Sequence, residues 1–113
     1  MAELAATLDL VLVPLRSPLA VAGFKEDESS IEGPYTWVRF RRQEQAQNQT
    51  WTRLITLSHA PAERAFLADV YLVSRSTHTR TPVARELRRY GDAAEAEVAA
   101  RELVEAVRGW VGA

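Results

Sequence analysis

The sequence predicts an α+β domain in which a four- or five-stranded, mostly antiparallel meander sheet is covered on one face by one long C-terminal helix. Two observations predict this class. Segments rich in β-branched and aromatic residues follow one another between residues 35 and 74, separated by short polar stretches. A long alanine-rich segment with helical periodicity then follows near the end of the chain.

Length and composition fit one globular domain over residues 1–113. The chain has a mass of 12.6 kDa, and it is 47% hydrophobic and 26% charged, which excludes wholesale disorder. No apolar run approaches the roughly 20 residues that a membrane span needs, so we expect no membrane association. The absence of cysteine excludes disulfides and cysteine nucleophiles. The acidic start of the chain predicts no signal peptide and a cytoplasmic location.

The first third of the chain predicts one strand and a long loop. Residues 7–13 carry apolar side chains at both parities, which is typical of a strand covered on both faces. Pro14 and Pro18 interrupt this pattern, so we expect an irregular apolar segment over residues 15–24. Residues 25–33 (KEDESSIEG) are acidic and rich in turn formers, and they predict an exposed loop.

The middle of the chain predicts a three-stranded antiparallel meander. We expect its strands over residues 35–42, 51–58 and 66–74, because these segments are enriched in the residues that strands favour. Short polar connections over residues 43–49 and 60–63 favour antiparallel pairing.

Residues 82–90 fit two structures. Thr81 as the N-cap, Pro82 at the first helical position and Gly91 as a stop favour a short helix. The alternative is a fifth strand that pairs with the third strand of the meander through a polar loop over residues 75–82.

Residues 92–108 give the clearest helix signal. Asp92 and Glu95 have the spacing of a capping box, and Gly109 predicts the end of the helix. One stripe at helical spacing is expected to face the sheet: Ala96, Ala99, Ala100, Leu103, Val107 and Trp110.

No set of residues predicts catalysis, a metal site or a cofactor. The two histidines, His59 and His78, are far apart and are expected in exposed turns or loops, whereas a metal needs three or four ligands. Ser58 adjoins His59, but neighbours on a strand point to opposite faces. Asp69 has no second acid at a useful spacing, so we expect it to face solvent or to pair with Arg39 or Arg53. We therefore predict that the protein is not an enzyme.

The charge is uneven along the chain. Residues 1–35 have a net charge of −4, residues 36–90 of +6 and residues 91–113 of −3. Arginine alternates with aromatic residues in the basic middle, which suits single-stranded nucleic acid because rings stack on bases and guanidinium groups bind phosphates. The candidate binding residues are Trp37, Arg39, Arg41, Arg42, Trp51, Arg53, Tyr71, Arg75 and Arg80.

The same composition also has causes unrelated to nucleic acid. The excess of arginine over lysine is expected from a GC-rich genome, and the tryptophans could be core residues beneath the helix. Ile55 and Leu57, which share the parity of Trp51 and Arg53, favour this placement in the core. Arginine and aromatic residues are also typical of protein–protein hot spots.

Two functions and one further possibility follow. We expect a non-enzymatic binding module for protein interaction or self-assembly, as a homodimer or higher oligomer, through an exposed sheet face. The alternative is binding of single-stranded nucleic acid through residues 35–75. A small-molecule pocket between sheet and helix is the third possibility.

Overall fold

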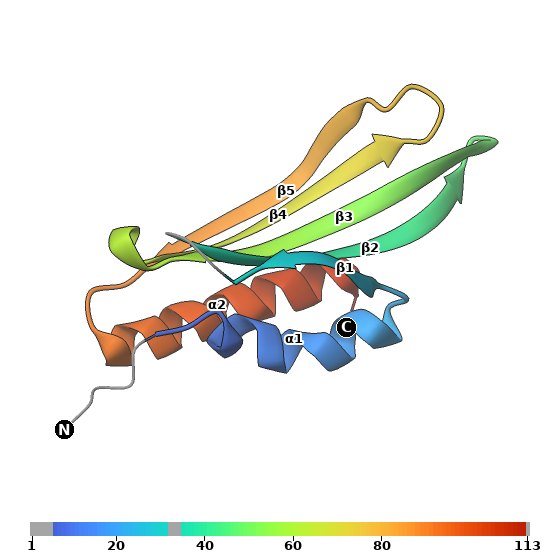
Figure 1. Cartoon of the computed structure of the whole chain (residues 1–113). Helices are drawn as coiled ribbons and strands as arrows, with labels where there is room; N and C mark the ends of the chain where they lie inside the picture. The colour runs from blue at the N-terminus through green and yellow to red at the C-terminus, as the bar shows by residue number, and fades with distance from the viewer. Residues whose placement is uncertain (1–5, 32–34, 113) are drawn as a thin grey trace.

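The computed structural model describes residues 6–31 and 35–112. They confirm the α+β class, with an antiparallel five-stranded meander and helices at both ends of the chain (Figure 1). In chain order the elements are α1 (Asp9–Val21), β1 (Lys25–Ser30), β2 (Thr36–Ala46), β3 (Gln49–Ala60), the 3₁₀ turn η1 (Pro61–Glu63), β4 (Ala65–Ser74), β5 (Arg80–Arg89) and α2 (Ala93–Val111).

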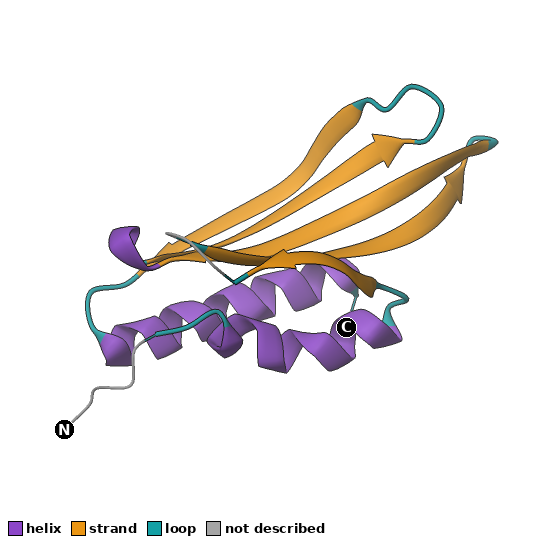
Figure 2. Cartoon of the chain, viewed as in Figure 1, coloured by secondary structure: helices purple, strands orange, loops and turns teal. Residues whose placement is uncertain are grey.

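The molecule has two layers. The strand order is β1-β2-β3-β4-β5, and every neighbouring pair is antiparallel. Both helices lie against the same face of the sheet, and the β2–β3 and β4–β5 hairpins reach beyond them (Figure 2). No helix in the described ranges is long and apolar enough to cross a membrane.

The predicted first strand is wrong, because residues 9–21 form helix α1. Its buried residues, Val11, Leu12, Leu15 and Leu19, have the spacing of one helix face, so burial of that face outweighs the local preference for a strand. Pro14 and Pro18 lie within the helix. Pro14 is exposed and Pro18 half-buried, so neither belongs to the fully buried face of the helix.

The predicted loop at residues 25–33 is wrong over residues 25–30, which form edge strand β1; residues 32 and 33 lie outside the described residues. An edge strand needs backbone pairing on one side only, and charged side chains protect its free edge from other chains. The sequence of β1 therefore lacks the apolar alternation by which strands are recognised. A bulge between Glu26 and Glu28 leaves Asp27 as the extra residue.

The β2–β3 hairpin is longer than predicted. Its strands extend through most of residues 43–49 and meet at a tight turn. Gln47 and Asn48 both have positive φ angles, 51° and 62°, as a two-residue hairpin turn of type I′ requires. This turn fixes which residues of the two strands stand opposite each other.

Residues 82–89 belong to strand β5 and Tyr90 follows it, so the favoured helix is wrong and the alternative fifth strand is confirmed. Pro82 is compatible with this position because β5 is an edge strand and its pairing with β4 shifts register there, between Val70 and Tyr71.

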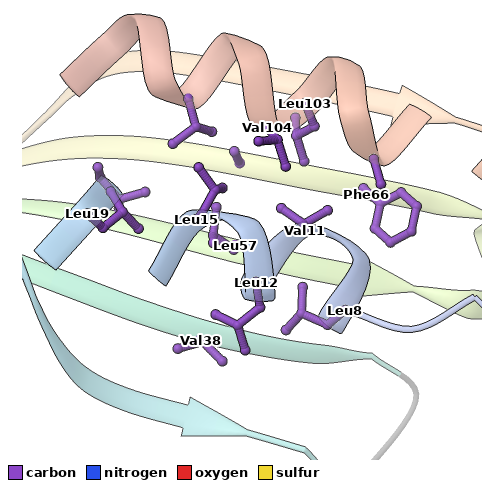
Figure 3. Packing of buried hydrophobic residues seen from close by; sticks show 14 of the residues in the cluster. Leu8, Val11, Leu12, Leu15, Leu19, Val38, Leu57, Phe66, Leu103 and Val104 are labelled. Atoms are coloured by element: carbon purple, nitrogen blue, oxygen red, sulfur yellow. The ribbon is translucent and has the colours of Figure 1, made fainter. Parts of the chain in front are cut away.

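Helix α2 has the predicted cap, because the Asp92 Oδ1 atom accepts the Glu95 N–H at 2.8 Å. The predicted end at Gly109 is wrong, because the helix continues to Val111 and is capped by Gly112, whose φ of 75° favours glycine. Five residues of the predicted stripe are buried: Ala96, Ala99, Ala100, Leu103 and Val107. They join the core between helices and sheet, shown in part in Figure 3.

Candidate binding face of the sheet

The face of the sheet that the helices leave uncovered is called the open face below. On β2, Val38 and Phe40 are buried against the helices. Trp37, Arg39 and Arg41 have the opposite parity, so they lie together on the open face, as the sequence predicts.

Trp51 and Arg53 lie on the other face. The register pairs Trp37 with Ser58, so the parity of Ser58 marks the open face on β3. Trp51 and Arg53 have the opposite parity, which they share with the fully buried Ile55. The prediction of one surface containing both tryptophans is therefore wrong. The parity that Trp51 shares with Ile55 is the sequence feature that indicates its place on the helix side.

Arg42 and Arg53 meet at Glu44 on the helix side of the sheet. The Glu44 Oε2 atom accepts from Arg42 Nη2 at 2.7 Å and from Arg53 Nε at 2.5 Å. Arg42 also donates to the Ala22 carbonyl at 2.8 Å and lies over the Phe24 ring, 4.5 Å from its centroid. The hydrogen bond from Arg53 lowers the pKa of Glu44. These two arginines tie the long hairpin to the end of α1, so they are engaged within the chain.

A row of charged side chains crosses the open face. The strand registers align five residues, one from each strand, which we call the charged row: Glu28, Arg39, Thr56, Asp69 and Arg85. Arg39 pairs with Glu28 at 2.8 Å and with Asp27 at 3.4 Å. Asp69 pairs with Arg85 at 3.7 Å, rather than with Arg39 or Arg53 as expected. Burial raises the pKa of Asp69, and Arg85 opposes that shift.

A partly apolar row lies beside the charged row. Its members, called the apolar row, are Ser30, Trp37, Ser58, Leu67 and Leu87. Leu87 is 42% exposed, and Trp37 and Leu67 are half-buried. Four members of the row, Trp37, Ser58, Leu67 and Leu87, line a groove of about 680 Å³ that extends from Arg39 and Arg85 to Tyr35 and Arg89.

The groove does not lie between the sheet and the helices. That space is filled by the hydrophobic core, to which α1, α2 and the inner side of the sheet contribute. The third possibility, a small-molecule pocket between sheet and helix, therefore has no support among the described residues.

The remaining candidate residues lie toward the far end of the hairpins. Tyr71 stands across from Leu54 on the open face. Arg75 lies in the β4–β5 loop and Arg80 begins β5; both are exposed. Among the described residues Arg75 and Arg80 have no ion-pair partner, whereas Arg41 lies 3.7 Å from an oxygen of Asp27.

His59 is buried, which contradicts its predicted exposure. It is 2% exposed, because β3 extends past the predicted strand end, and its ring stacks on Phe66 at 4.6 Å between centroids. Its Nε2 atom lies 2.6 Å from the Tyr90 hydroxyl. Burial lowers the pKa of His59 and raises that of Tyr90. His78 is exposed in the β4–β5 loop, as predicted.

The described residues contain no group of three or more His, Cys, Asp or Glu side chains that could hold a metal ion. The open face carries apolar side chains in one row and ion-paired side chains in the next. No protein-family model, curated protein or solved structure matches this chain.

Proposed function

We propose that this chain is a non-enzymatic binding module that associates with a protein surface through its open face, in a cytoplasmic setting. The observation that carries the proposal is the groove along the apolar row, where Trp37, Leu67 and Leu87 lie on a face that neither helix covers. Apolar side chains gathered on one uncovered face are typical of an interaction surface. Burying them against a partner would remove apolar area from water.

The charges on the open face favour a protein partner. Arg39 and Arg85 are already paired with carboxylates of the same face, so a phosphate would have to compete with those carboxylates. Trp51 lies on the other face, which interrupts the aromatic platform that single strands require. Aromatic and arginine side chains with matched acids are typical of protein interfaces.

Both sheet edges are protected, which directs association to the open face. Edge strand β1 carries Glu26, Asp27 and Glu28 and a bulge. Edge strand β5 carries Pro82 at an irregular position in its register. Charges, bulges and proline are the features by which edge strands avoid pairing with other chains.

The proposal is tested with a charge placed in the apolar row. We expect wild-type protein at micromolar concentration to associate, and Leu67→Arg to abolish association, as followed by light scattering after size exclusion. The matched control is Val98→Arg, because Val98 is 48% exposed on α2, away from the open face. Circular dichroism establishes that both variants are folded. Association that survives Leu67→Arg contradicts the proposal.

Binding of single-stranded nucleic acid is the second candidate. The observation in its favour is that Arg75, Arg80 and Arg89 have no ion-pair partner within the described ranges. A fluorescent oligonucleotide titrated at two salt concentrations tests it. Replacing Arg75, Arg80 or Arg89 by Ala should each reduce, by about 0.7, the slope of the logarithm of the binding constant against the logarithm of the salt concentration. Absence of binding by wild-type protein at low salt excludes this candidate.

A further inference from the structure

We infer that the occupant of the open face is a second copy of this chain, packed face to face. The twofold axis lies between the two open faces and is parallel to β3. The inference rests on the proposed function and adds the partner and its register. It places β1 of each protomer over β5 of the other, and β2 over β4.

The charged row is self-complementary, which is the main argument for this arrangement. Read from β1 to β5, its side chains are negative, positive, neutral, negative and positive: Glu28, Arg39, Thr56, Asp69 and Arg85. The reversed row has the opposite charge at every charged position. Rotation about an axis parallel to β3 exchanges the two edges of the sheet but leaves positions along the strands unchanged. The charged row of one copy therefore lies over the charged row of the other, read in the reverse order.

Two kinds of contact follow, each formed twice. Glu28 faces the second copy's Arg85, and Arg39 faces the second copy's Asp69. Two aligned sheets rotate by about 30° relative to each other, so the match is closest near the axis, where Arg39 and Asp69 lie one strand to either side of Thr56. The ion pairs within each protomer would then extend into a network across the interface.

The neighbouring rows also fit. In the apolar row, Trp37 would face Leu67 of the second copy, which covers the groove with apolar surface. In the row on the other side, Arg41 would face Tyr71, a favourable pairing of a guanidinium group with an aromatic ring. A rotation axis perpendicular to the strands would instead bring β1 over β1 and β5 over β5, with like charges opposed.

The size of the face is sufficient for a stable dimer. At a spacing of about 4.8 Å, four strands roughly 33–40 Å long and the shorter β1, roughly 20 Å long, give a surface of roughly 800 Å². This equals the area that each partner contributes to a standard protein–protein interface.

Charge reversal at the two edges tests the register. In Glu28→Lys alone, or Arg85→Glu alone, both edge contacts of the dimer would join like charges. We expect each change to raise the dimer dissociation constant by about tenfold or more at low salt. An equimolar mixture of the two variants should recover dimers, because both contacts are then between opposite charges. The same recovery is expected when both changes are present in one chain. Sedimentation velocity measures all four samples.

Recovery can arise only between copies. Within one chain, Glu28 and Arg85 are four strand spacings apart, roughly 19 Å, so they do not touch. Each single change removes one ion pair within the chain, Glu28 with Arg39 or Arg85 with Asp69, and the combined variant lacks both, so recovery cannot come from these pairs. The matched control is Glu26→Lys with Arg88→Glu. These residues lie on the same two strands but on the helix side of the sheet, because the bulge at Asp27 places Glu26 beside Phe40 and the register places Arg88 beside Phe66. We therefore expect neither weakening nor recovery.

The outcomes distinguish the register from the proposed function. Weakening by each single change followed by recovery supports the inference. A wild-type dimer that Leu67→Arg disrupts, but that shows no recovery by charge exchange, overturns the register and leaves the proposed function standing. A dimer that Leu67→Arg does not affect overturns both. A monomeric wild-type protein overturns the second copy as the occupant, whereas association of the open face with a different protein is compatible with that result.

Discussion

The imidazole Nε2 atom of His59 lies 2.6 Å from the hydroxyl oxygen of Tyr90, and this contact joins the end of β3 to the segment that leads into α2. The ring of Phe66, on β4, stacks on that of His59 at 4.6 Å between centroids, and the Tyr90 ring lies 6.0 Å from it, so two aromatic rings flank the imidazole. The environment favours the neutral form of the ring because burial penalises its charge.

Acid should therefore destabilise the fold through His59. Its pKa is lower in the folded chain than its ordinary value of 6.5, so the unfolded chain takes up the proton first as the pH falls. The free energy of unfolding should decrease from about pH 6.5 downward until the folded state is also protonated. Urea denaturation at pH 8, 6.5 and 5 measures this decrease. His59→Gln should flatten this part of the profile, with His78→Gln as the control; an unchanged profile in His59→Gln would contradict the assignment.

Leu103 should contribute strongly to stability. It is fully buried in the middle of α2, so Leu103→Ala should lower the free energy of unfolding by about 2–5 kcal/mol. The neighbouring Glu102 is exposed, and Glu102→Ala should change the free energy of unfolding by no more than about 0.5 kcal/mol. Chemical denaturation of both variants makes the comparison, and equal effects would show that the helix packs by a different face.

Glu44 should stabilise the long hairpin. Glu44→Gln removes the charge that joins Arg42 and Arg53, so we expect a loss of about 1 kcal/mol. The pKa of Glu44 is lowered in the folded chain, so its contribution is present above its ordinary value of 4.5 and is lost as the pH falls below it. Gln43→Ala, an exposed change on the same strand, is the control. Equal denaturation midpoints at pH 7 would show that the cluster adds no stability.

The two tryptophans of the hairpin should differ in their effect on association. Trp37→Ala removes an aromatic side chain from the open face, so it should raise the dissociation constant of self-association by tenfold or more, as expected of about 2 kcal/mol at a hot spot. Trp51→Ala, on the opposite face, should leave that constant nearly unchanged. Sedimentation velocity compares the two variants. A larger effect of Trp51→Ala would place the interface on the helix side of the sheet and contradict the account.

The predictable parts of the fold are those with strong periodicity. The alternation of Val38 and Phe40 with Trp37 and Arg39 identifies β2, and the alanine stripe identifies α2. Helix α1 was missed because its apolar residues also alternate and because two prolines argue locally against a helix. Strand β1 was missed because a charged edge strand is stabilised by backbone pairing, which leaves no pattern in its side chains.

The candidate site was predictable within a strand but not between strands. Spacing alone places Trp37, Arg39 and Arg41 on one face. Which residues of β3 join them depends on the two-residue turn at Gln47 and Asn48, because a shift of one residue reverses every side chain of a strand. The charged row depends on four such registers at once, so the strand sequences do not reveal it.

The measurement that most directly tests the open face as an interface is sedimentation equilibrium of the wild-type protein across the micromolar range. The account predicts an apparent mass that rises with concentration from 12.6 kDa toward twice that value. It also predicts a rise that weakens at high salt, because ion pairs cross the interface. A single species of 12.6 kDa at every concentration would contradict self-association through this face.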